Sequence, residues 1–194
     1  IPTTSILIPV YNRIDHIGAC IESALGQTER DIEVVVVDNA SNDGTWEICQ
    51  QFAARDMRVR IFRNEKNIGP LKNWARCIEL AHGKYGKLLF SDDLILSRFL
   101  ERSLPLIRNR DVAFVFSSVE MGPAPGQGKK AYRWRPRTGI YRKYAYLRAA
   151  MFGGEVPMSP GAALFRLDDL RKSLVYEIPG CEAHAYLNLG AGPD

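Results

Sequence analysis

The stretch "IEVVVVD", residues 32–38, is apolar almost without interruption and ends in an aspartate. A strand with one face in solvent alternates apolar and polar residues, whereas a strand covered on both faces is apolar throughout. Residues 32–38 therefore predict a buried strand of a parallel sheet, with Asp38 at its carboxyl end.

Other apolar runs of strand length lie on both sides of this stretch, and segments with a helical spacing of apolar residues separate them. The runs are SILIPV (5–10), VRIF (59–62), YGKLLF (85–90) and VAFVF (112–116). Up to residue 117 the predicted order is therefore βαβαβαβαβ. This alternation predicts an α/β fold with a doubly wound, mostly parallel, Rossmann-like sheet and right-handed crossovers.

The second half of the sequence is less regular. "MGPAPGQGKK" (121–130) has the composition of a loop. We expect a helix within residues 139–152, a strand over 161–167 and a short helix over 168–174. The chain has 194 residues, of which 46% are apolar, and this suits a single domain. Because it opens without methionine, we expect a trimmed chain.

Composition narrows the class of protein further. No apolar run approaches the roughly 20 residues that cross a bilayer. The four cysteines are scattered without CxxC spacing, which favours small buried side chains over a zinc site or a disulfide framework. They are Cys20, Cys49, Cys77 and Cys181. A reducing, cytoplasmic location fits this pattern.

Polar side chains follow three of the predicted strands. Residues 11–13 (Tyr-Asn-Arg) follow the first strand, Asp38 and Asn39 close the second, and Asp92 and Asp93 close the fourth. In open α/β sheets, ligands bind beyond the carboxyl ends of the strands. Three separate segments are therefore expected to deliver polar groups to one edge of the sheet.

Two common phosphate-binding motifs are absent from the sequence. No GxGxxG follows the first strand, which argues against a nicotinamide or flavin dinucleotide, and no GxxxxGK[ST] indicates a P-loop. A site without a glycine cradle commonly binds phosphates through Mg²⁺ or Mn²⁺, which take one or two carboxylates plus substrate oxygens. Asp92 and Asp93 could supply those carboxylates.

Four ordered blocks resemble family 2 glycosyltransferases of the GT-A fold. They are "SILIPVYNR", "EVVVVDNASNDGT", "NEKNIGPLKNWARCIELAHGKY" and "LLFSDDL", which together span roughly residues 4–117. The resemblance implies an inverting transfer of a sugar from a nucleotide-diphosphate donor, usually UDP-linked, to a hydroxyl acceptor. It also implies one domain over 1–194, with a nucleotide-sugar-binding half (1–117) and an acceptor-side half (118–194) that we expect to be truncated.

The resemblance also implies roles for individual residues. Asp38 corresponds to the acidic residue that contacts the base, and Pro9 and Tyr11 would line the same pocket. Asp92 matches the position that approaches the ribose. Asp93 matches the ligand of Mn²⁺ or Mg²⁺.

The catalytic base is expected from the last residues of the sequence. Asp194, in "GAGPD", resembles the family's late aspartate that takes the proton from the acceptor hydroxyl. The acceptor would be a glycan, a lipid-linked sugar or another hydroxyl compound.

Two positions depart from the family pattern. Many members carry an additional aspartate where Phe90 stands, and many carry a second aspartate where Asn39 stands. Neither change removes the expected metal ligand, but both alter the donor contacts.

Residues 129–148 form a basic and aromatic segment. From Met121 to Gly154 no acidic residue occurs, whereas eight Lys and Arg residues do. Such a segment could bind nucleic acid, form an active-site flap, hold an acidic acceptor or make peripheral contact with anionic lipid. The preceding strand ends at the polar edge of the sheet, so a flap or acceptor loop is favoured and no nucleic acid partner is expected.

Two other classes of function stay open from the sequence. A sugar-nucleotide-binding module without turnover would bind the donor and release no UDP. A nucleotidyltransferase would release pyrophosphate rather than UDP, although "VDNASNDGT" (37–45) fits that class poorly.

Overall fold

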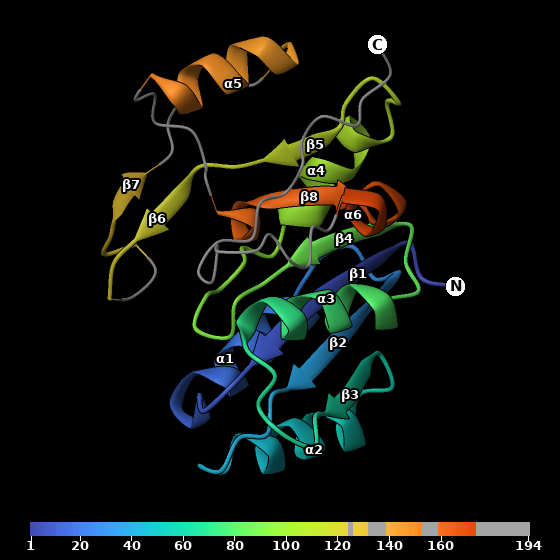
Figure 1. Ribbon diagram of the computed structural model, residues 1–194, viewed down its shortest axis with the longest axis vertical. Helices are drawn as coiled ribbons and strands as arrows, with labels where there is room; N and C mark the ends of the chain where they lie inside the picture. Colours follow the sequence, from blue (N-terminus) through green and yellow to red (C-terminus); the bar gives the residue numbers. More distant parts are fainter. Residues whose placement is uncertain (124–125, 132–138, 153–158, 174–194) are drawn as a thin grey trace.

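The computed structural model describes residues 1–123, 126–131, 139–152 and 159–173 (Figure 1). A six-stranded sheet lies at its centre, and β6 and β7 form a separate two-stranded sheet. The strands are β1 (Thr4–Val10), β2 (Ile32–Asp38), β3 (Val59–Arg63), β4 (Tyr85–Leu88), β5 (Phe114–Phe116), β6 (Val119–Met121), β7 (Lys129–Ala131) and β8 (Ala163–Arg166). The helices are α1 (Ile14–Leu25), α2 (Thr45–Arg55), α3 (Pro70–Leu80), α4 (Phe99–Ile107), α5 (Lys143–Met151), the 3-10 turn η1 (Pro160–Ala162) and α6 (Leu167–Ser173).

The parallel part of the sheet agrees with the prediction. Strand β1 lies between β2 and β4 and pairs with both in parallel, and β2 pairs in parallel with β3. The order across the sheet is β3-β2-β1-β4-β8-β5. The carboxyl ends of β1, β2 and β4 therefore meet at one edge.

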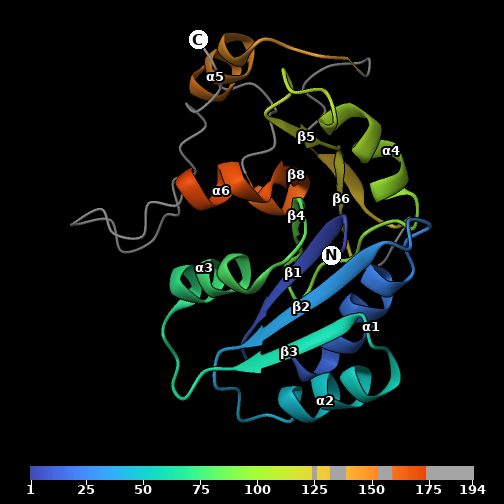
Figure 2. The same ribbon diagram turned by 90° about the vertical axis from the view of Figure 1, so that its right-hand side faces the viewer.

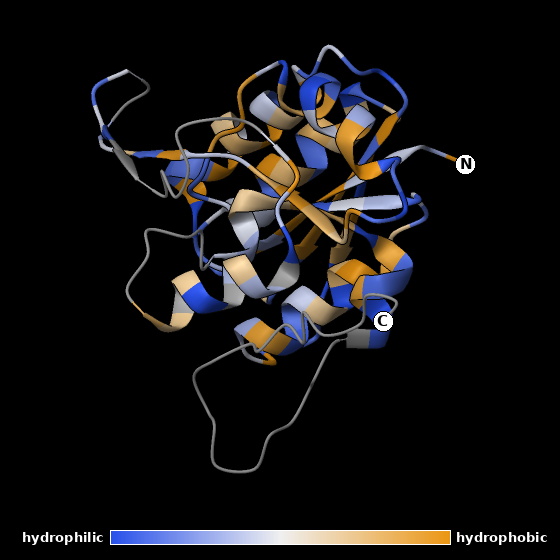
Figure 3. Cartoon of the chain, turned by 90° about the horizontal axis from the view of Figure 1, so that it is seen from above, coloured by the Kyte–Doolittle hydropathy of each residue, from blue (hydrophilic) through white to orange (hydrophobic). Residues whose placement is uncertain are grey.

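Helices cover both faces of the sheet, which explains the uninterrupted apolar run of β2. Helices α1 and α2 lie on one face of β1–β3 and α3 lies on the other (Figure 2). Val34 and Val36 belong to the apolar cluster on the first face, and Val35 and Val37 belong to the cluster on the second. Seen from above, strands at the centre of the molecule are strongly apolar (Figure 3).

The strand predicted over 161–167 is present as β8, but its place in the sheet was not predictable from its sequence. β8 lies between β4 and β5 and runs antiparallel to both. Its Leu164 is fully buried and belongs to the same cluster as the residues of α1 and α4. Residues after 117 thus contribute a strand to the sheet that the first part of the chain forms.

The described cysteines are buried, as predicted. Cys20, Cys49 and Cys77 are free thiols in the apolar interior, and burial raises the pKa of each. None of the helices within the described residues has the length and hydropathy to cross a bilayer.

One charged residue of β4, Lys87, is buried, with 2% of its surface exposed. Its Nζ donates a hydrogen bond to the carbonyl oxygen of Gly161 and lies 4.8 Å from the centre of the Phe99 ring. Burial lowers the pKa of Lys87 to about 8, while the nearby carboxylate of Asp93 acts in the opposite direction. The ammonium group therefore lies beneath the turn that carries the two aspartates.

Leu164→Ala tests whether β8 is part of the core. Removing a fully buried leucine side chain typically costs about 2–5 kcal/mol in free energy of unfolding. Leu96, which is 81% exposed, provides the matched control, and its replacement by Ala should change stability by less than about 0.5 kcal/mol. Urea denaturation measures both, and equal losses would contradict the placement of β8.

Lys87→Met tests the burial of the lysine through pH. The folded-state pKa of about 8 lies below the value of about 10.4 in an unfolded chain. The unfolded chain therefore binds more protons between these values, and this residue's contribution to stability rises with pH.

We compare the free energy of unfolding of the unsubstituted chain with that of Lys87→Met. Between roughly pH 7 and pH 9, this difference should shift by about 1 kcal/mol in favour of the unsubstituted chain. The exposed Lys84, replaced by Met, should show no such pH-dependent difference. Denaturation curves at both pH values provide the measurement. A stability difference that is constant with pH would show that Lys87 is hydrated in the folded chain.

Candidate functional site

The carboxyl edge of the sheet brings together the three predicted polar segments. Pro9 is buried near the end of β1, and Tyr11 follows that strand with 43% of its surface exposed. Val10 pairs with Asp38, the last residue of β2. The amide of Leu89 donates to the carbonyl of Leu7, so the chain after β4 reaches the same edge.

Asp38 is fully buried at this edge. Its two carboxylate oxygens lie 3.3 and 3.2 Å from the amide nitrogen of Ser41, which donates to them. Arg63 Nε lies 3.1 Å from Oδ2 of Asp38 in an ion pair. The carboxylate thus fixes the start of the loop after β2 and holds an arginine.

Arg63 is a site residue that the sequence analysis did not identify. It is the last residue of β3 and the register partner of Asp38. Its side chain is 41% exposed, lies 5.5 Å from the centre of the Trp46 ring, and donates to the carbonyl of Ser41. Arg63 therefore lies between the buried Asp38 and solvent. Only the parallel register of β2 and β3 could have indicated this partnership.

The loop after β1 is tied to the loop after β2. The backbone amide of Asn12 donates to Ser41 Oγ at 2.9 Å, and Asn12 Oδ1 accepts from the amide of Asn42 at 3.0 Å. Asn12 adopts a left-handed conformation (φ 50°), which asparagine tolerates better than most residues. Two hydrogen bonds therefore join the two loops beside the end of β1.

The carboxylate of Asp43 accepts hydrogen bonds at the amino ends of two helices. Its carboxylate accepts from the amide of Ile14, the first residue of α1, and from the amide of Thr45, the first residue of α2. A carboxylate at these positions satisfies amides that have no partner inside a helix.

Asparagine side chains tie the loop before α3 to the end of β2. Asn39 Oδ1 accepts from Asn64 Nδ2 at 2.8 Å and from the amide of Ile68 at 3.0 Å. Asn39 Nδ2 donates to Asn67 Oδ1 at 2.8 Å. An aspartate at residue 39 could not donate that bond. The departure from the family pattern at Asn39 therefore has a structural reason.

Asp92 and Asp93 lie in an exposed turn after β4, closed by a bond from the amide of Asp93 to the carbonyl of Phe90 at 2.9 Å. The pKa of Asp93 is raised, first by partial loss of hydration and second by repulsion from Asp92, while Lys87 acts in the opposite direction. Phe90 packs against Trp74 with ring centres 5.0 Å apart. An aromatic contact thus occupies the position where many members have an aspartate.

The Asp92–Asp93 turn suits a divalent cation that shares its coordination with substrate oxygens. Among the described residues no cluster of three or more His, Cys, Asp or Glu side chains could hold a metal alone. Mg²⁺ and Mn²⁺ commonly take one or two carboxylates and complete their shell with phosphate and water. The pKa of Asp93 is raised first by partial loss of hydration and second by repulsion from Asp92, and a bound cation would relieve the second of these.

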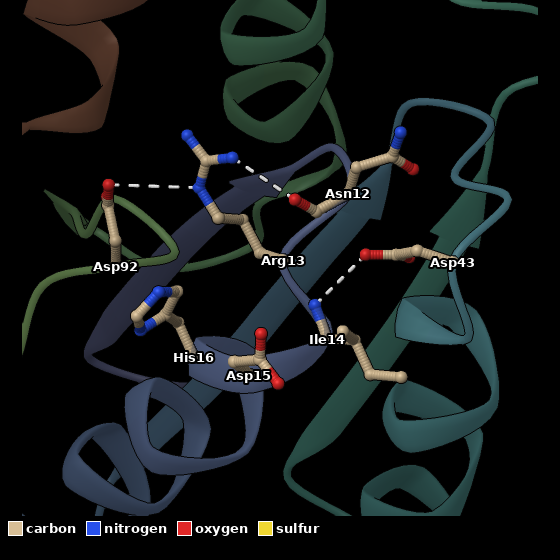
Figure 4. A pocket seen from close by; sticks show the side chains of 7 residues that line it. All are labelled: Asn12, Arg13, Ile14, Asp15, His16, Asp43 and Asp92. Atoms are coloured by element: carbon tan, nitrogen blue, oxygen red, sulfur yellow. Dashed lines mark hydrogen bonds and ion pairs between the residues drawn. The ribbon is translucent and has the colours of Figure 1, made fainter.

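A hollow of about 410 Å³ opens beside Asp92 (Figure 4). Residues 12–16, Asp43 and Asp92 line it. Arg13 Nε lies 3.8 Å from Oδ2 of Asp92, and both side chains are about half exposed. In this hollow the positively charged side chain of Arg13, from the loop between β1 and α1, lies beside the carboxylate of Asp92 after β4.

The predicted base Asp194 lies outside the described residues, as do His184 and Cys181. Of the basic segment 129–148, residues 132–138 also lie outside them.

Known glycosyltransferases resemble this chain in sequence and in structure. The UDP-Glc:alpha-D-GlcNAc-diphosphoundecaprenol beta-1,3-glucosyltransferase WfaP of Escherichia coli is 33% identical over 116 residues, which are 59% of this chain and 45% of WfaP. Staphylococcus aureus TarS 1–349 superposes with a TM-score of 0.71 at 21% identity, over 90% of this chain and 51% of TarS 1–349. The structure of TarS 1–349 in complex with UDP-GlcNAc superposes with a TM-score of 0.67.

A third similar protein is the mannosyltransferase PcManGT of Pyrobaculum calidifontis, solved in complex with GDP-Man and Mn²⁺. It superposes with a TM-score of 0.62 at 21% identity, over 88% of this chain and 46% of PcManGT. At these identities the two structures establish the GT-A fold alone. The chain spans about half the length of WfaP, of TarS 1–349 and of PcManGT. The family model for glycosyl transferase family 2 matches residues 5–174. The chain is therefore a member of glycosyl transferase family 2.

Proposed function

We propose that this chain transfers a sugar from a nucleotide-diphosphate donor, UDP-linked, to an acceptor hydroxyl with inversion at the anomeric carbon. The observation that carries the proposal is the convergence of Asp38, Tyr11 and the Asp92–Asp93 pair at one edge of the sheet. Membership of family 2 and the donors bound by similar proteins support it.

The nucleoside would bind at the ends of β1 and β2. Tyr11 is exposed there, and Arg63 covers the buried Asp38. In this arrangement the base contacts Arg63 first. Asp38 either forms a hydrogen bond with the base after Arg63 shifts, or positions Arg63 for its own contact with the base. Asp92 would approach the ribose and Pro9 would form the floor. The names of WfaP and of the TarS complex favour UDP, whereas the PcManGT complex contains GDP-Man.

The diphosphate would lie toward the Asp92–Asp93 turn. Asp93 would hold a Mn²⁺ or Mg²⁺ ion, which supplies positive charge that makes the nucleoside diphosphate a better leaving group. Arg13 contributes a second positive charge beside Asp92. The PcManGT complex with Mn²⁺ supports this choice of cofactor.

The acceptor would approach from the side opposite the leaving group. A carboxylate, for which we propose Asp194, takes the proton from the acceptor hydroxyl while that oxygen bonds to the anomeric carbon and the bond to the diphosphate breaks. One displacement of this kind inverts the configuration. A glycan or a lipid-linked sugar would serve as acceptor, and the acceptor in the name of WfaP is of the lipid-linked kind.

Calorimetric titration of UDP with and without Mn²⁺ tests the donor site. We expect Mn²⁺ to tighten UDP binding, and Asp93→Asn to weaken binding in Mn²⁺ by at least about tenfold, because the amide removes the charge that holds the cation. Binding in the absence of metal should be equal in both proteins. The exposed Asp111, replaced by Asn, is the matched control and should retain the metal effect.

The same titrations can refute the proposal. Metal-dependent binding that survives in Asp93→Asn would remove Asp93 from the site. If UDP does not bind under either condition but GDP binds in a metal-dependent way, the proposed donor would be a GDP-sugar. The proposed roles of the other site residues would then stand.

Product analysis separates the proposed transferase from the two other classes. Incubation with a sugar nucleotide and Mn²⁺ should release the nucleoside diphosphate slowly through transfer to water. Release of pyrophosphate would instead indicate a nucleotidyltransferase. Tight binding with no release, even with acceptor sugars present, would indicate a binding module.

A further inference from the structure

Helix α5 presents an apolar face to solvent. Tyr144, Arg148 and Met151 recur at helical spacing and therefore share one face. Tyr144 is 71% exposed and Met151 is 78% exposed. Ile140 before the helix and Phe152 after it are 66% and 80% exposed, respectively. We refer to these five residues as the α5 outer face.

The opposite side of α5 is attached to the sheet through aromatic contacts. The Tyr146 ring lies edge-on to Phe114 with centres 5.3 Å apart, and 5.9 Å from the ring of Phe116. Both phenylalanines belong to β5, the outermost strand of the sheet. The helix stands at the end of the molecule opposite α2 (Figure 1). The α5 outer face is thus directed away from the body of the protein.

Exposed arginines accompany these apolar side chains. Arg142 and Arg148 are both exposed. The sequence from Gly122 to Gly154 contains eight Lys and Arg residues and no Asp or Glu. Exposed apolar side chains beside exposed arginines suit contact with a membrane surface, where apolar groups enter the acyl boundary and arginines contact anionic headgroups.

We propose that the α5 outer face docks this chain onto an anionic phospholipid bilayer. The contact is peripheral and independent of the donor chemistry, because no residue of the α5 outer face belongs to the candidate site. Ile140, Met151 and Phe152 supply the apolar contact, and Arg142 and Arg148 supply attraction to the negative surface.

A second copy of the chain fits this surface less well. Two-fold symmetry would bring Arg142 and Arg148 of one copy close to those of the other, and no carboxylate lies within residues 122–154 to pair with them. A nucleic acid would pair with the arginines but would leave Ile140 and Met151 without a suitable contact, because aliphatic side chains offer no stacking surface for bases.

Vesicle sedimentation tests the proposal. The probe is vesicles of phosphatidylcholine, either alone or mixed with phosphatidylglycerol. We expect the chain to sediment with the anionic vesicles and to remain in solution with the neutral ones. Met151→Asp combined with Phe152→Asp should reduce the partition coefficient by more than about tenfold, because it removes apolar contact and adds repulsive charge.

Two matched variants control for nonspecific effects. Met57→Asp changes a methionine that is 95% exposed between α2 and β3, at the other end of the molecule, and should bind vesicles as the unsubstituted chain does. Arg148→Gln should weaken binding by about fivefold, whereas the exposed Arg110→Gln should not. Thermal unfolding confirms that the variants are folded, since all these side chains are exposed.

Several results would overturn the proposal. They are equal binding to neutral vesicles, absence of binding to anionic ones, and equal loss in Met57→Asp. Light scattering that shows a dimer abolished by the Met151 and Phe152 changes would assign the face to self-association. Binding of an oligonucleotide that depends on Arg148 but not on Met151 or Phe152, without vesicle binding, would assign it to nucleic acid.

Discussion

The parallel pairing of β1 with β2 and β4 is the constraint on which the rest of this structure depends. It aligns the ends of strands that are far apart in sequence, so that Val10, Asp38 and Arg63 lie in one row across three strands. Ion pairs near the two ends of β2, from Glu33 to Arg60 and from Asp38 to Arg63, fix the register, because a slip by one residue would separate both pairs. The site is therefore as well defined as the core beneath it.

Short polar side chains hold the loops at this edge of the sheet together through hydrogen bonds. Ser41 and Asn12 join the loops after β1 and β2, and Asn39 and Asn64 join the loop before α3 to the same edge. Amides serve here because each both donates and accepts, so buried backbone groups of two loops are satisfied by one side chain. The side chains at the candidate site are thus positioned by loops that these serine and asparagine side chains hold in place.

Local sequence patterns were sufficient for the strands of the six-stranded sheet, for its helices and for the edge that carries the candidate site. They missed the β6–β7 pair, because residues 121–130, which include one residue of β6 and most of β7, have the composition of a loop. The apolar runs of β1 to β4 were predictable because burial on both faces leaves a continuous signal in the sequence. Two features were not predictable in the same way. The place of β8 between β4 and β5 and the pairing of Arg63 with Asp38 depend on which strands become neighbours, and no local pattern encodes that. The roles of Asp93 and Asp194 rest on resemblance and stay predictions.

The insertion of β8 beside β4 has a consequence for the order in which the chain can fold. During synthesis β1 to β4 emerge before β8 exists, and Lys87 contacts Gly161, 74 residues later. Until then β4 is an edge strand with unpaired backbone groups, open to pairing with other chains. A lysine on such an edge hinders that pairing. The residue whose burial opposes stability in the finished fold therefore protects the nascent sheet from aggregation.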